Sequence, residues 1–225
     1  MEKYSELEEL CKLGGNAIEQ TFDRIRFNAD LSFLGPQLPE YAFLLGLKNG
    51  FYAFAEALHV YTYLPSDRYN EQEVVTWNKA SLWKRAYGLT EVKPFAFAED
   101  IFGYQFCFDV EGVTRFDPET GELEPVCSTL DEWAGLMLTD PEAHLGYETA
   151  REWSQTKGSI RQGERLLPIY PFITSEGSAD LTNLYSVDAL KGMLSRADFA
   201  RQIKSVPDGQ PIEIVPLIPQ NRNPS

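Results

Sequence analysis

Acidic side chains that lie close together in the chain are the first candidates for chemistry. Two carboxyl groups facing each other across a cleft can hydrolyse a glycosidic bond, one as the acid and the other as base or nucleophile. The pairs are Glu99–Asp100, Asp109 with Glu111, Glu119 with Glu122, and Asp131–Glu132. Acidic pairs beside turns are more often simply solvated. A carboxylate-based hydrolase is therefore the lesser of the functions we consider.

Histidine and cysteine offer little for metal binding or nucleophilic catalysis. His59 and His144 lie far apart and no Cys-x-x-Cys motif occurs, so we expect no metal site and no cofactor. His59 lies among aromatic residues with strand character, which favours a core or sheet position over a catalytic base. Cys107 alternates with Phe106 and Phe108 and has no visible base nearby, which indicates a buried thiol. Neither a phosphate-binding glycine loop nor a Gly-x-Ser-x-Gly elbow is present.

The charge of the chain favours a basic partner. Its 225 residues include 34 acidic and 20 basic side chains, a formal net charge of −14. This charge argues against binding to nucleic acid or to an anionic membrane. It favours basic partners, although acidity can also serve solubility alone. The segment 91–142 holds 13 acidic and two basic residues, and such clustering is what a site for a cationic partner needs.

The chain has features of a cytoplasmic protein. Its N-terminus is acidic and polar without the apolar run of a secretory signal, and uncharged stretches are too short for a membrane helix. The three cysteines, Cys11, Cys107 and Cys127, are widely spaced and odd in number, which fits free thiols in a reducing compartment. We therefore predict a cytoplasmic protein without membrane contact.

Hydrophobic spacing predicts the elements that would position these groups. Helices are expected over 2–13, 39–49, 70–87, from Thr129, over 141–157 and over 186–203, where Ser195 and Asp198 could instead cap a separate helix. Strands are expected over 51–55, 57–64, 95–97, 104–108, 113–116 and 123–127, the later ones joined by tight turns into a β-meander. The fold class is α+β: a mixed, mostly antiparallel sheet flanked by helices on one side, with a helical C-terminal extension. We assign a core domain to 1–140 and an extension packed on it to 141–225, with one continuous domain as the alternative.

Two stretches, read together, resemble the SMI1/KNR4 family, also called the SUKH superfamily. The first begins at Leu38-Pro39 and ends in Lys48-Asn49-Gly50. The second runs from Phe97 through Glu99-Asp100-Ile101-Phe102-Gly103 into an aromatic strand and then to Ser128-Thr129-Leu130-Asp131-Glu132-Trp133. The resemblance covers about residues 30–140, and the segment 141–225 lies outside it.

The resemblance implies a non-enzymatic binding protein. Bacterial members of the family are similar to immunity proteins that bind and neutralise toxins delivered between competing cells, and eukaryotic members are similar to regulatory adaptors. We therefore expect an immunity protein for a cationic toxin, such as a nuclease, with an intracellular adaptor as the alternative. The residues expected to contact the partner are Glu99, Asp100, Asp109, Glu111, Glu119, Glu122 and Glu124. The sequence predicts no oligomeric state.

Overall fold

The computed structural model describes residues 4–64, 72–89, 94–110 and 112–205. The predicted partner contact Glu111 and the last part of the predicted extension, 206–225, lie outside these ranges. Within the described residues, no helix combines the length and apolar character that crossing a membrane requires.

The centre of the fold is a six-stranded antiparallel meander. The strands are β1 (Phe51–Ala53), β2 (Leu58–Val60), β3 (Phe95–Glu99), β4 (Gln105–Asp109), β5 (Gly112–Phe116) and β6 (Leu123–Cys127). They are hydrogen-bonded in chain order, and each pairing between them is antiparallel. A parallel contact occurs as an isolated bridge between Thr62 and Glu73. The α+β class and the meander are thus confirmed.

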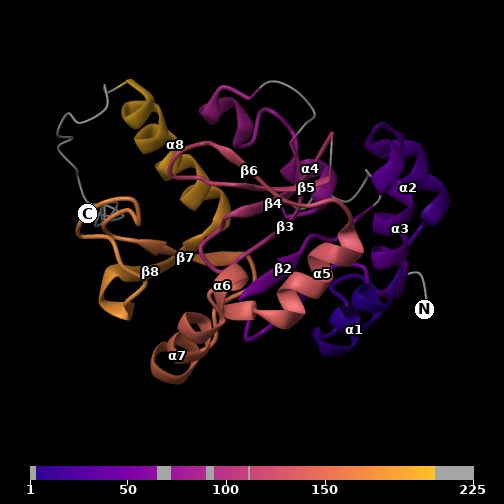
Figure 1. Ribbon diagram of the computed structural model, residues 1–225, viewed down its shortest axis with the longest axis horizontal. Helices are drawn as coiled ribbons and strands as arrows, with labels where there is room; N and C mark the ends of the chain where they lie inside the picture. Colours follow the sequence, from indigo (N-terminus) through magenta and orange to yellow (C-terminus); the bar gives the residue numbers. More distant parts are fainter. Residues whose placement is uncertain (1–3, 65–71, 90–93, 111, 206–225) are drawn as a thin grey trace, which may run out of the picture.

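Helices and a second, two-stranded sheet surround the meander (Figure 1). The α-helices are α1 (Ser5–Leu13), α2 (Arg24–Asp30), α3 (Leu38–Leu47), α4 (Val74–Trp77), α5 (Leu130–Thr139), α6 (Pro141–Leu145), α7 (Tyr147–Lys157) and α8 (Ala189–Ser205). Short 3-10 helices are η1 (Ser32–Gln37), η2 (Lys84–Tyr87) and η3 (Leu181–Asn183). The second sheet pairs β7 (Glu164–Pro168) with β8 (Leu184–Asp188) in antiparallel register.

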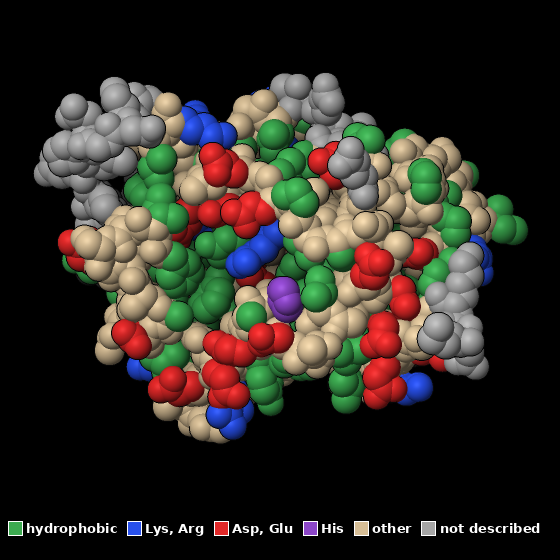
Figure 2. Space-filling model, in the orientation of Figure 1, with side chains coloured by type: hydrophobic (Ala, Val, Ile, Leu, Met, Phe, Trp, Pro, Cys, Tyr) green, Lys and Arg blue, Asp and Glu red, His purple; other side chains and the backbone are tan. Residues whose placement is uncertain are grey.

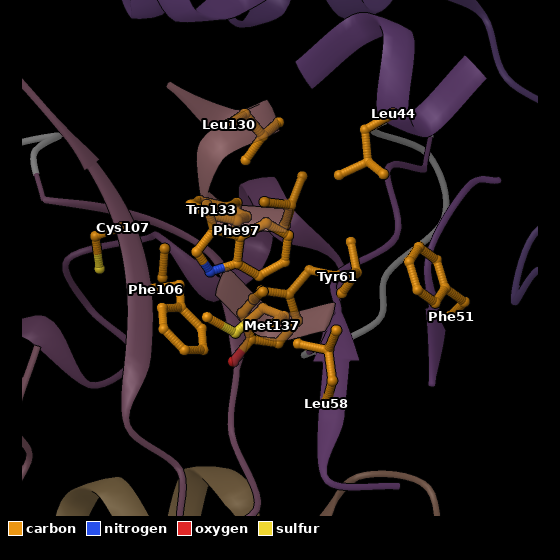
Figure 3. Close-up of a cluster of buried hydrophobic side chains, with 14 of the residues drawn as sticks. Leu44, Phe51, Leu58, Tyr61, Phe97, Phe106, Cys107, Leu130, Trp133 and Met137 are labelled. Carbon is orange, nitrogen blue, oxygen red and sulfur yellow. The ribbon is translucent and has the colours of Figure 1, made fainter. Parts of the chain in front are cut away.

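One face of the meander packs against α3 and α5. Phe97 stacks on Phe108 with ring centroids 4.4 Å apart, and Trp133 of α5 meets Phe97 edge-on at 5.0 Å. Tyr41 of α3 lies against Phe108 at 5.2 Å. Figure 3 shows this aromatic centre, with Trp133 directed into the cluster beside Phe106. Aromatic burial on this scale supplies much of the driving force for folding.

The other face is covered as well, which corrects the expectation of helices on one side. Trp77 of α4 donates a hydrogen bond to Gln105 Oε1 at 2.8 Å, and Met193 of α8 contacts the same side chain. Arg165 of β7 pairs with Glu99 of β3. Because both faces are covered, all five residues of β3 are buried. The described part of the extension, 141–205, therefore packs against the meander and contributes residues such as Leu145 to the same buried cluster.

The prediction of a long helix over 70–87 is wrong. Within its described part, the chain is helical at α4 and in the 3-10 turn η2. The side chain of Asn78 explains the interruption, because it bonds the backbone of Ala96 in both directions at 2.7 and 2.8 Å. These bonds tie the chain to β3 directly after Trp77 and replace a continued helix.

Glycine also divides the helix predicted over 141–157. Gly146 adopts φ +68°, and a Cβ there would lie 2.5 Å from the ring of Phe102. The chain therefore turns between α6 and α7. In contrast, α8 is a single helix that follows β8, and Ser195 bonds the carbonyl of Gly192 inside it instead of capping a second helix.

Candidate functional site

Three of the seven acids expected to contact a partner are buried. Glu99 and Glu119 have 0% of their surface exposed and Asp100 has 1%. Each is held by internal partners, so none of them is accessible to another protein. The prediction is wrong for these three residues because clustering along the sequence does not show which side chains point inward.

Glu99 is the centre of a buried polar cluster. Its Oε1 lies 2.9 Å from Arg165 Nε and 3.0 Å from His59 Nδ1, and its Oε2 accepts a hydrogen bond from Gln105 Nε2 at 3.2 Å. Tyr61 donates to Gln105 Oε1 at 2.7 Å. We call Glu99, His59, Arg165 and Gln105 the buried polar cluster. It joins β2, β3 and β4 of the meander to β7.

The cluster keeps one negative and one positive charge in the interior. The Arg165 guanidinium and the His59 hydrogen bond outweigh burial and lower the pKa of Glu99 to about 2. Burial lowers the pKa of His59 to about 4, so its ring is neutral near pH 7. The ionised Glu99 can only accept, so His59 Nδ1 carries the proton and Nε2 is left as an acceptor.

Asp100 holds the loop between β3 and β4 in place. Asp100 Oδ1 accepts from the backbone nitrogens of Phe102 and Tyr104, each at 2.9 Å, and Oδ2 lies 3.3 Å from Arg115 Nη2. Burial raises the pKa of Asp100 to about 6 in spite of these contacts.

Glu119 holds a segment of the extension in place in the same way. It accepts hydrogen bonds from the backbone nitrogens of Phe172 and Ile173 at 3.1 and 3.2 Å, and burial raises its pKa. The carboxylate therefore holds the segment after β7 against the turn between β5 and β6.

The remaining described acids predicted to contact a partner lie at the end of β4, in the turn before β6 and on β6. Asp109 is half-buried, and Glu122 and Glu124 are exposed. Glu124 belongs to β6, an edge strand that Pro125 interrupts, and proline and charge on an edge discourage pairing with another strand. These three residues are available to solvent but do not by themselves form a dense acidic patch.

Helices α1, α5 and α6 carry a denser group of acids. They pack side by side, and Asp131 Oδ1 of α5 accepts from the backbone nitrogens of Glu6 and Leu7 at the start of α1. Figure 2 shows the acidic side chains over these helices. We call this the helical acidic surface; its members with exposed or half-buried side chains are Glu6, Glu8, Glu9, Asp131, Glu132, Asp140 and Glu142. The basic side chains on these three helices are Lys12, which pairs with Glu9, and His144.

A groove lies beside the buried polar cluster. One part, of about 520 Å³, runs between the end of α1, the turn from β1 to β2, and Ile160. An adjoining part, of about 390 Å³, reaches His59 and Asp188. Both parts share Ile18, Tyr52 and Gln162 in their walls. Tyr52 stacks on the His59 ring with ring centroids 4.3 Å apart, and the Arg165 guanidinium carbon lies 5.4 Å from the Tyr52 ring centre.

The sequence favours a core or sheet position for His59, which is buried, but it does not reveal the Arg165 charge that pairs with Glu99 in the same cluster. Arg165 precedes the apolar Leu166 and Leu167 in a short strand, and a lone arginine in such a run was the available signal for a buried ion pair. The described residues contain no group of three histidine, cysteine or acidic side chains arranged to hold a metal ion. Cys107 is buried, as predicted, and burial raises the pKa of its thiol to about 12.

Comparisons with known proteins identify a fold and not a family. No family model matches the chain, and no curated protein matches it. The crystal structure of Atu4351 from Agrobacterium tumefaciens is similar, with a TM-score of 0.54 and 12% sequence identity. The similarity covers 84% of this chain and 87% of that chain. At this identity the likeness concerns the fold alone.

Proposed function

We propose that the chain is a non-enzymatic binding protein of the immunity type, which binds and neutralises a cationic toxin in the cytoplasm. The helical acidic surface carries the proposal, because six acids lie on three adjoining helices, a seventh, Asp140, lies between α5 and α6, and one lysine is among them. Such a surface attracts a basic partner at long range and suppresses acidic ones. The resemblance of 30–140 to the SMI1/KNR4 family supports the immunity role, and a regulatory adaptor is the alternative.

The positions of the paired carboxylates give a hydrolase less support than a binding protein. The two members of the Glu99–Asp100 pair are buried and engaged in separate internal contacts. A catalytic pair must instead reach a substrate in a cleft. Binding through a charged surface requires no such pair.

Co-purification from native cells tests the proposal. The tagged protein is compared with a variant carrying Glu6→Gln, Glu8→Gln and Glu9→Gln on α1. A matched control removes three exposed acids of the extension, with Glu176→Gln, Asp180→Asn and Asp198→Asn. We expect a basic toxin domain that is retained by the control, reduced with the α1 variant and lost as salt rises.

Two other outcomes count against the proposal. A basic partner without toxin activity would transfer the function to the adaptor alternative. A partner that binds all three proteins equally at every salt concentration would contradict recognition through the helical acidic surface.

A further inference from the structure

The groove beside Tyr52 offers hydrogen-bond acceptors and negative charge. Glu56 lies in the wall of one part and Asp188 in the wall of the other. Within the described residues, neither wall includes a lysine or arginine. His59 also lines the part of the groove that contains Asp188, and its ring is neutral near pH 7. A ligand group that fits these walls carries N–H donors and positive charge.

The groove also offers apolar surface between its acids. Leu13 at the end of α1 is 57% exposed and Ile18 is 37% exposed, and Phe54 and Ile160 complete this lining. Lysine and arginine bury their methylene stems along apolar surface while the charged end reaches a polar group. A wall that combines aliphatic and aromatic side chains with carboxylates therefore suits a lysine or arginine side chain better than a purely apolar side chain.

The turn that borders the groove is held in an unusual conformation. Phe54, Ala55 and Glu56 have φ values of +53°, +52° and +64°, although none of them is glycine. The left-handed region is unfavourable for each such residue, because the Cβ lies too close to the following carbonyl oxygen. Edge-on contact of Phe54 with Tyr147 of α7, at 6.0 Å between ring centres, helps to hold the turn. The groove wall that contains Glu56 is thus formed before any partner binds.

We propose that this groove receives a lysine or arginine side chain presented on an extended segment of the cationic partner. The inference rests on the proposed function, because that partner is the protein recognised by the helical acidic surface. The two sites are continuous through α1, which carries Glu6, Glu8 and Glu9 along its length and Leu13 at its end. Charge complementarity selects the occupant: the walls hold two carboxylates and, among the described residues, no lysine or arginine.

Titration of the isotope-labelled protein with a short blocked peptide tests the groove without the partner. The probe is acetyl-Leu-Arg-Leu-amide, and its control is the same peptide with neutral citrulline in place of arginine. We expect the arginine peptide to shift the amide resonances of Tyr52, Gln162 and Gly163 and to bind more tightly than the citrulline peptide.

Two variants localise the effect. Asp188→Asn keeps a side-chain acceptor for the Lys191 backbone nitrogen at the start of α8 while removing the charge, and we expect about threefold weaker binding of the arginine peptide. Asp180→Asn removes an exposed charge outside the groove and should leave the affinity unchanged.

The inference is overturned if arginine and citrulline peptides bind equally, if the shifts map elsewhere, or if neither peptide binds at millimolar concentration. Its failure is separate from failure of the proposed function. Partner capture that depends on the α1 acids, together with no peptide binding in the groove, would retain the function and reject the groove as its site.

Discussion

Arg165 Nε lies 2.9 Å from Glu99 Oε1, and both side chains are buried. The pair joins β7 of the extension to β3 of the meander. Each charge would be costly in the interior without the other, so the charge balance of the meander depends on a residue contributed by the segment 141–225. The extension is therefore part of what stabilises the sheet.

Neutralising Glu99 should destabilise the protein strongly. Glu99→Gln leaves the Arg165 guanidinium buried without an opposite charge, and we expect a loss of roughly 3–5 kcal/mol in the free energy of unfolding, measured by urea denaturation. Glu124→Gln, on the exposed edge strand β6, is the control and should change stability by less than about 0.5 kcal/mol. Equal effects would show that the buried ion pair has no special role.

Stability should fall as His59 is forced to take up a proton. Its pKa of about 4 in the folded chain lies below the ordinary 6.5, so the unfolded chain binds more protons between these values. The stabilising contribution is fully present above pH 6.5 and is lost as the pH falls towards 4. Between pH 7 and pH 5 we expect a loss on the order of 2 kcal/mol.

The variant His59→Gln isolates this contribution. Asp100 acts in the opposite direction, because its raised pKa of about 6 favours the folded state at low pH. Glu99 contributes a loss at lower pH, between its ordinary value and about 2. The difference in stability between the natural chain and the variant should therefore shrink from pH 7 to pH 5. A difference that is independent of pH would mean that His59 is not buried in its neutral form.

Glycine should relieve the backbone strain of the β1–β2 turn. Ala55 has φ +52°, so Ala55→Gly removes the cost of a left-handed alanine, which exceeds the added entropy of the unfolded chain. We expect thermal denaturation to show a gain of roughly 0.5–1 kcal/mol. Ala53→Gly, in the preceding strand β1, serves as the matched control and should destabilise instead. Destabilisation by both changes would argue against strain at Ala55.

Removing the Glu119 carboxylate should loosen one segment. Glu119→Ala leaves the backbone nitrogens of Phe172 and Ile173 without their acceptor, and we expect faster hydrogen exchange at these two amides. The amides of β4 should keep their protection. Uniform acceleration throughout the chain would indicate global destabilisation and not a local fastening.

Local sequence patterns predict much of the fold but do not show which acidic side chains are buried. The helix predicted from Thr129 is confirmed as α5, and the capping box of Thr129 and Glu132 with which it begins depends only on neighbouring residues. The buried acids depend on partners far along the chain: Glu99 on Arg165, and Glu119 on the segment after β7. No periodicity shows such pairings.

A contact between distant residues also explains why the prediction of a helix over 70–87 is wrong. Its spacing is compatible with a helix, but the two bonds between Asn78 and Ala96 compete with helical hydrogen bonding, and they exist only once β3 is in place. The helical acidic surface was missed because α1 and α5 are adjacent only in the folded chain.

The dependence of binding affinity on salt tests the central claim most directly. The dissociation constant of the basic partner captured by this protein is measured between 50 and 300 mM NaCl for the natural chain, the α1 variant and the extension control. If the helical acidic surface recognises the partner, affinity falls steeply with salt for the natural chain and the control, and less steeply for the α1 variant. Identical salt dependence for all three proteins would contradict the account.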